Sequence, residues 1–189
     1  NDWLSLASTS DFAFGTGDFT WEYWFKAEDD GSYHLHFPDS GASIDYYTYQ
    51  SATRRLRYTN STTSAKEITD VILSKGIWYH FAAARSSGTT KVFLNGIEKL
   101  SFSDTHNYGN SSLYIGATNV GGSQFNGKIS NLRIVKGTAV YTSSFRVPTE
   151  PLTNITNTTL LCCNNSSVTG KTVGGTITAT GSPTALSDS

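Results

Sequence analysis

The chain has 189 residues, which is enough for one domain with a sizeable core and no covalent cross-links. Aromatic residues make up 13% of it and charged residues only 15%, a balance that is typical of a folded, sheet-rich chain and excludes disorder for most of its length. The formal net charge of -1 provides no basic surface for nucleic acid and no polybasic anchor for a membrane, so neither is an expected partner.

The first half of the chain alternates between apolar and polar residues. The opening NDWLSL looks like a strand, and because the chain contains no methionine we expect residue 1 to be an internal or processed position of a longer polypeptide. From Phe19 to Phe25 every second residue is a large aromatic, which predicts a strand with one buried face. Residues 33–37 and 55–59 repeat this pattern over shorter lengths. Residues 78–84 are apolar on both faces and predict a central strand.

The strongest local signal lies in KVFLNGIEKLSF, residues 91–102. Two alternating runs are joined there by Asn95 and Gly96, which accept the positive φ angles of a type I′ turn. The sequence therefore predicts a β-hairpin.

A further strand is predicted up to Gly137, with Ser130, Leu132 and Ile134 on one face and Ile129, Asn131, Arg133 and Val135 on the other. Residues 138–152 contain two prolines three positions apart, which cannot donate to a strand ladder. We expect this segment to run over the surface and to insert Tyr141 and Phe145 into the body, with both prolines exposed.

The last third closes the fold with the short strands TTLLCC and GTITAT. Adjacent cysteines can close only a strained ring, so Cys162 and Cys163 are interpreted as two reduced thiols. About a dozen short strands separated by turns predict an all-β sandwich. We expect one domain over residues 1–180, followed by a tail or linker over residues 181–189.

Three blocks carry a resemblance to a known family: FAFGTGDFTWEYWFKA, WYHFAAARSSGTTKVFLNG and LYIGATNVGGSQFNGKISNLRIVKGTAVYTSSF. Their order and spacing are similar to the concanavalin A-like lectin/glucanase superfamily, in its laminin G type, and this resemblance implies a jelly-roll sandwich of two antiparallel sheets. The last block, followed by PLTNITNTTLLCC, resembles modules of virion structural proteins of tailed phages, notably those of marine cyanobacteria. The superfamily includes lectins, glucanases, adhesion modules and spacers, so the resemblance implies the fold more directly than the function.

Catalysis is not supported by the residues. The glucanases of this superfamily use two carboxylates about 5 Å apart on one strand face, and no Glu-x-Asp-x-x-Glu motif occurs here. Glu22 alternates with aromatic residues and is interpreted as a solvated or hydrogen-bonded strand residue. His80 is interpreted as a packed strand histidine, because no nucleophile lies beside it in the sequence.

Two ligand sites are hypotheses. Aromatic rings that stack on sugars could come from Trp24, Tyr46, Tyr47 and Tyr49. Related laminin G modules bind calcium at a sandwich rim, and Asp104, Asn107, Asn110 and Asn119 carry the hard oxygen ligands for such a site. The same residues are also common in ordinary turns. No other cofactor is expected.

The leading hypothesis is a non-enzymatic module of a phage virion, on the capsid or a fibre-like appendage. It would contact other virion subunits or further copies of itself, and host-surface carbohydrate is a second expected partner. The alternative is a secreted or cell-surface adhesin with the same fold that binds glycans, and a glycoside hydrolase comes third. Aromatic rings open to solvent would favour glycan binding, and rings covered by another subunit would favour a structural role.

Overall fold

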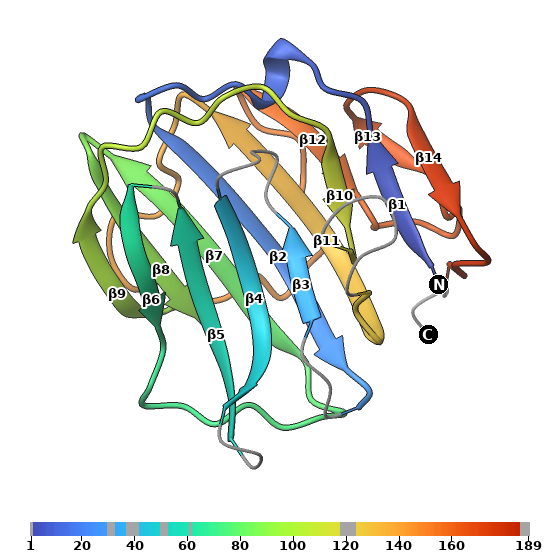
Figure 1. Ribbon diagram of the computed structural model, residues 1–189. Coiled ribbons are helices and arrows are strands. Elements are labelled where there is room, and N and C mark those ends of the chain that lie inside the picture. The colour runs from blue at the N-terminus through green and yellow to red at the C-terminus, as the bar shows by residue number, and fades with distance from the viewer. Residues whose placement is uncertain are drawn as a thin grey trace.

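The computed structural model describes residues 2–29, 33–36, 42–49, 53–60, 62–117 and 124–185, with the backbone alone for residues 33–36, 42–49, 53, 54 and 63. Strands account for nearly all of its regular structure, and they lie in two layers (Figure 1). Every strand pair in the described residues is antiparallel. The all-β jelly-roll sandwich predicted from the sequence is therefore confirmed. No helix in this part of the chain is long and apolar enough to cross a membrane.

One layer is a sheet of seven strands in the order β13-β12-β11-β2-β7-β8-β9. The strand bounds are β2 (Phe19–Ala27), β7 (Tyr79–Ser86), β8 (Thr89–Leu94), β9 (Ile97–Ser103), β11 (Gly127–Lys136), β12 (Thr158–Cys162) and β13 (Lys171–Val173). Strand β2 lies at its centre, between β11 and β7. Strands far apart in the sequence are therefore hydrogen-bonded neighbours, as in a jelly roll.

The other layer differs from the expected single sheet, because it consists of two separate ones. A four-stranded sheet has the order β3-β4-β5-β6, and a three-stranded sheet has the order β10-β1-β14. The bounds are β1 (Trp3–Leu6), β3 (Tyr33–His36), β4 (Ala42–Tyr49), β5 (Thr53–Asn60), β6 (Thr63–Glu67), β10 (Leu113–Ile115) and β14 (Ile177–Thr180). One short helical turn, Ser10–Phe12, follows β1.

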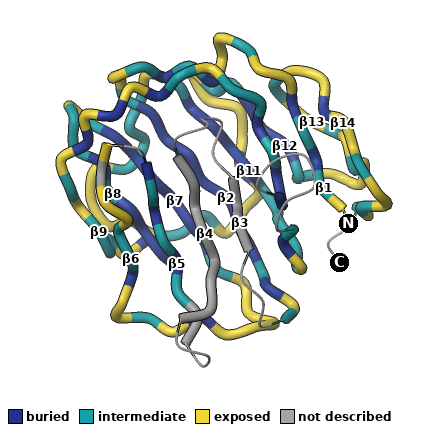
Figure 2. Tube along the Cα trace, viewed as in Figure 1, coloured by how far each residue is buried: buried dark blue, intermediate teal, exposed yellow. Residues whose placement is uncertain are grey.

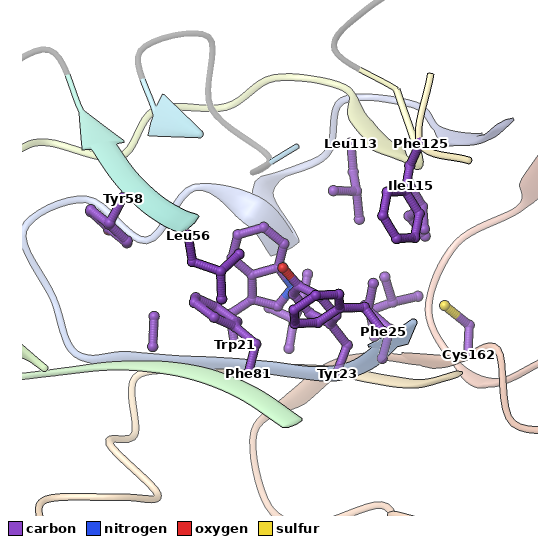
Figure 3. Packing of buried hydrophobic residues seen from close by; sticks show 14 of the residues in the cluster. Trp21, Tyr23, Phe25, Leu56, Tyr58, Phe81, Leu113, Ile115, Phe125 and Cys162 are labelled. Atoms are coloured by element: carbon purple, nitrogen blue, oxygen red, sulfur yellow. The ribbon is translucent and has the colours of Figure 1, made fainter. Parts of the chain in front are cut away.

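The core between the layers is rich in aromatic residues. The alternation in β2 is as predicted, with the side chains of Phe19, Trp21, Tyr23 and Phe25 all buried. Leu56 of β5 points down from the opposite layer toward Trp21 and Phe81 (Figure 3). The ring of Tyr58, also of β5, packs against Phe102 with 5.5 Å between centroids. Buried segments accordingly concentrate in the middle strands of the large sheet (Figure 2). Burial of this apolar surface is the main stabilising contribution.

The predicted hairpin is confirmed. Strands β8 and β9 are joined by Asn95 and Gly96, with φ angles of 51° and 76°. Gly96 is also needed because a Cβ atom there would lie only 2.1 Å from the carbonyl oxygen of Phe145. The turn therefore touches the segment that crosses the outer face of the sheet.

That segment, residues 138–152, is called the strap. It lies on the side of the large sheet away from the core, where Tyr141 and Phe145 pack against Ala82, Ala84 and Phe93 (Figure 1). The two strap rings stack on each other, with centroids 3.6 Å apart and planes 7° apart. The expectation of a surface segment with inserted aromatic residues is confirmed, although both rings are only partly buried. Of the prolines, Pro151 is exposed and Pro148 is half-buried, so full exposure of both was wrong.

Backbone contacts attach the strap along its length. At its start, the Thr20 hydroxyl donates to Thr138 O (2.9 Å) and accepts from Val140 N (2.7 Å). In the middle, Phe145 N donates to Gly96 O (2.8 Å). At its end, Leu152 N donates to Asn131 Oδ1 (3.0 Å).

Strand β11 departs from the expected alternation. Leu132 and Ile134 face the core as predicted, but Ile129 also packs against the core, on the face opposite to the one expected. The reason is a bulge, since the register with β2 shifts between Ser130 and Arg133 and Asn131 has a φ of 51°. A left-handed residue inserts one extra position and reverses the faces on its N-terminal side.

Candidate functional site

An open groove of about 690 Å³ lies at one corner of the sandwich. Its lining is about equally polar and apolar, and it includes several amides and hydroxyls together with two tryptophans. The residues that carry these groups are Trp3, Trp78, Asn126, Ser130, Asn131, Asn164, Asn165, Ser166, Ser167 and Ser182. Amides and hydroxyls that both donate and accept hydrogen bonds, beside aromatic rings, suit a small polar ligand.

The groove exists because β12 accompanies only part of β11. In the described ladder, Leu132 to Val135 of β11 pair with β12, whereas Gly127 to Ser130 pair with β2 alone. Residues 163–168 leave the end of β12 and form the opposite wall, together with residues 182–185 after β14. The bulge at Asn131 stands at the point where the strands separate. Local backbone geometry therefore produces the groove.

Trp78 is the most accessible aromatic side chain of the groove, with 36% of its surface exposed. It immediately precedes β7, and the Lys26 ammonium lies 5.4 Å from its ring centroid. Sequence reasoning placed Trp78 in a central strand with two apolar faces but did not select it as a site residue. The available signal was a tryptophan at the start of a strand, preceded by the exposed Ile77.

The predicted sugar-binding aromatics are only partly described. Trp24 lies on the outer face of β2, half-buried, with its ring edge-to-face against His80 at 5.2 Å between centroids. It does not line the groove, although its ladder partner Ser130 does. The side chains of Tyr46, Tyr47 and Tyr49 lie outside the described residues, so their role stays a prediction.

The predicted calcium ligands do not converge in the described residues. Asp104 is buried, and its carboxylate accepts four hydrogen bonds: Oδ1 from Asn60 Nδ2 (3.2 Å) and His106 N (3.0 Å), Oδ2 from Thr90 Oγ1 (2.6 Å) and Tyr108 OH (2.8 Å). Both oxygens are thus occupied by internal donors. The carboxylate holds the loop after β9 against the core, because Asn60 of β5 and Thr90 of β8 donate to it as well as His106 and Tyr108 of the loop itself.

The other three members of that set differ in position. Asn107 and Asn110 are exposed, and Asn110 Oδ1 accepts from the Ser8 hydroxyl at 2.6 Å. Asn119 lies outside the described residues. No group of three or more His, Cys, Asp or Glu side chains suited to a metal ion occurs within the described ranges. Calcium binding at this rim stays a prediction.

A buried charged cluster lies beneath the strap. Both oxygens of the fully buried Glu22 are used: Oε1 accepts from Arg133 Nε at 2.9 Å, and Oε2 accepts from Tyr141 OH at 2.8 Å and from His80 Nε2 at 3.2 Å. The Arg133 Nη2 atom also donates to Oε1, and Nη1 donates to Thr153 O at 3.0 Å. Glu22 and His80 are therefore packed, hydrogen-bonded strand residues, as interpreted from the sequence.

The cluster fixes the ionisation of its members. Burial raises the pKa of Glu22, but the hydrogen bond from His80 and the charge of Arg133 outweigh it, so the net pKa is lowered. Burial, with the neighbouring Glu22 charge, raises the pKa of the Tyr141 hydroxyl. Glu22 is thus a carboxylate and Tyr141 a donor at neutral pH. A carboxylate held in this way is a poor proton donor for glycoside cleavage.

A two-layered antiparallel sandwich is characteristic of jelly-roll modules. The family model described as the concanavalin A-like lectin/glucanases superfamily matches residues 1–140. The chain therefore belongs to this superfamily. A search of curated protein sequences found no match.

Solved structures share this fold at low sequence identity. A putative carbohydrate binding protein from Bacteroides ovatus has a TM-score of 0.70 at 14% identity, over 95% of this chain and 58% of that one. Domain 4 of the arabinanase AbnA from Geobacillus stearothermophilus, in complex with arabinotriose, has a TM-score of 0.51 at 22% identity, over 73% of this chain and 68% of that one. The enzymatically active domain of bacteriophage CBA120 tailspike protein 2 has a TM-score of 0.51 at 14% identity, over 71% of this chain and 24% of that one.

Proposed function

We propose that this chain is a carbohydrate-binding module that performs no catalysis itself. The observation that carries the proposal is the groove, whose lining includes the exposed ring of Trp78 as well as amide and hydroxyl side chains. Sugars present apolar C–H faces that stack on aromatic rings and hydroxyls that need paired donors and acceptors. Membership of a lectin-containing superfamily and the fold shared with carbohydrate-binding structures support this function.

The absence of catalysis rests on how the nearest carboxylates are engaged. Glu22 is buried in an ion pair with Arg133. In the groove, Asp2 Oδ1 accepts from Ser182 N at 2.9 Å, and Glu28 Oε1 lies 3.3 Å from Lys128 Nζ. Hydrolysis would require one protonated and one ionised carboxyl facing each other across a sugar. The module would therefore bind its glycan without turnover.

The test is a glycan microarray followed by calorimetric titration of the best oligosaccharide. Trp78→Ala should weaken binding by about tenfold or more, which is the expected loss of a stacking contact. Trp24→Ala is the matched control, because Trp24 lies on the same sheet but does not line the groove. Equal affinity of wild type and Trp78→Ala, with loss in Trp24→Ala, would move the site to the outer sheet face. Release of reducing sugar from the bound glycan would refute the non-catalytic role.

We further propose that the module works on a phage particle, as part of a capsid decoration or a fibre-like appendage. The resemblance of residues 125–145 to virion modules supports this context, and a phage tailspike domain has the same fold. Antibodies raised against the purified chain should label intact particles in electron micrographs. Labelling of a cell surface or secreted fraction, without labelling of particles, would favour the adhesin alternative.

A further inference from the structure

Cys162 and Cys163 lie at the end of β12, where it meets the groove. In an extended strand, adjacent side chains point to opposite faces, which keeps the sulfur atoms of neighbouring cysteines apart. Here Cys163 has a φ of 57°, the left-handed conformation that non-glycine residues seldom adopt. As a result the two Sγ atoms are only 3.7 Å apart. The left-handed conformation of Cys163 thus brings both thiols close together, and not onto opposite faces of the strand.

A specific contact maintains this conformation. The carbonyl oxygen of Cys163 accepts a hydrogen bond from Asn131 N at 2.8 Å, and Asn131 itself has a φ of 51° at the β11 bulge. Two left-handed residues on adjacent strands therefore support each other. An uncommon backbone state that the surrounding structure maintains often accompanies a functional site.

The two thiols differ in their surroundings. The Cys162 side chain is fully buried and points into the space between the layers, as Figure 3 shows. Cys163 is half-buried and lines the groove. Both cysteines are free thiols. A small molecule in the groove can therefore reach Cys163, whereas Cys162 is buried and does not line the groove.

We propose that Cys162 and Cys163 form a dithiol site that low-molecular-weight disulfides oxidise to a disulfide between the two adjacent residues. The Cys163 thiolate attacks the external disulfide and releases one thiol, which leaves a mixed disulfide on Cys163. The Cys162 sulfur then attacks Cys163 Sγ and releases the second thiol. In sum, two protein thiols and one external disulfide give one protein disulfide and two external thiols.

The sulfurs need to approach from 3.7 Å to a bond length of about 2.05 Å. The ring formed between adjacent residues is strained, and strained disulfides are readily reduced. The site would therefore be reversible. Closure would also alter the groove wall, because Cys163 lines it and its carbonyl is bonded to Asn131.

Oxidised glutathione added to the reduced, folded chain tests this proposal, with acid quenching and mass spectrometry as the readout. The wild type should lose about 2 Da, the mass of two hydrogen atoms, and regain it with a dithiol reductant. Cys162→Ala should accumulate a stable glutathione adduct on Cys163, because the second sulfur is missing. In Cys163→Ala, Cys162 should react at least about tenfold more slowly than Cys163 does in the wild type, because it is buried.

Thermal melting should confirm that each variant is folded, and Cys162→Ser replaces Cys162→Ala if the alanine variant is not. Stable glutathione adducts on the wild type would overturn the proposal. Disulfide-linked dimers, or no reaction of the folded wild type while the denatured chain reacts, would overturn it as well. The result is independent of glycan binding, so failure here leaves the proposed function standing.

Discussion

At the scale of single residues, Glu22 links the large sheet to the strap. Its carboxylate is bonded to Arg133 and His80 on neighbouring strands and to Tyr141 of the strap. Removal of one partner of a buried ion pair leaves the other charge uncompensated, which costs more than loss of a surface pair. The residue therefore stabilises the arrangement of three segments at once.

We expect Glu22→Gln to lower the free energy of unfolding at pH 7 by about 3 kcal/mol. The folded pKa of Glu22 is lowered, so the contribution of its charge is present above the unfolded pKa of about 4.3 and is lost as the pH falls through the folded value. The stability difference between wild type and variant should therefore shrink on acidification below about pH 4. Urea denaturation between pH 7 and pH 3 measures it.

Glu98→Gln is the matched control. Glu98 pairs with Lys91 at 2.9 Å, but both side chains are about one-third exposed, so the change should cost less than about 1 kcal/mol. A Glu22→Gln effect that is as small as this, or one that grows in acid, would contradict the structural role of the charge.

At the scale of elements, the strap is the least regular segment and depends on its two rings. Phe145 lies against Phe93 with 5.3 Å between ring centroids and stacks on Tyr141. Phe145→Ala should lower the free energy of unfolding by about 2 to 3 kcal/mol, at the lower end for a phenylalanine because the ring is only partly buried. Chemical denaturation measures this loss.

Limited proteolysis gives a second readout, since a loosened strap should be cut within residues 138–152 before the sheets unfold. Ser143→Ala, at an exposed strap position, should change neither quantity. If Phe145→Ala has the same free energy of unfolding and the same proteolysis pattern as the wild type, the ring does not hold the strap.

The strands could be predicted wherever alternation is strict, as in β2 and in the hairpin of β8 and β9. The strap could be predicted from its prolines. The strand face on which Ile129 lies could not be predicted from the sequence. The bulge that reverses this face depends on a contact between Asn131 and Cys163, which are far apart in the sequence. The groove escaped prediction for the same reason, since it arises where β12 leaves β11 and involves residues near both ends of the chain.

The candidate site residues were likewise predictable only as far as their roles depend on local sequence. Asp104 was a candidate calcium ligand in the sequence, but its hydrogen-bond donors, including Asn60 and Thr90, lie on strands that meet only in the folded chain. Without them, a buried structural carboxylate and a metal ligand look alike in the sequence.

At the scale of the whole molecule, the proposed role on a particle predicts close contact with neighbouring copies. The chain has few charges, and Ser, Thr, Asn and Tyr cost little to desolvate when their hydrogen bonds are satisfied. As a module of a particle, the protein should occur in symmetric multiple copies, with an interface of at least about 1,000 Å² that includes aromatic residues. Light scattering after gel filtration of the full-length protein should show an oligomer. A monomer at high concentration would argue against this assembly.

The pairing of β1 with β14 determines how the module would respond to a pulling force. Trp3 lies opposite Thr180 and Leu6 opposite Ile177, so the first residue of β1 and the last residue of β14 are neighbours at one corner of the sandwich (Figure 1). A load applied through both ends would open this ladder one hydrogen bond at a time, like a zipper, and would not shear all the bonds together. The module is mechanically weak in that geometry, whereas a tether at one end alone leaves the pair unloaded. A module that bears tension would therefore best be attached through a single end.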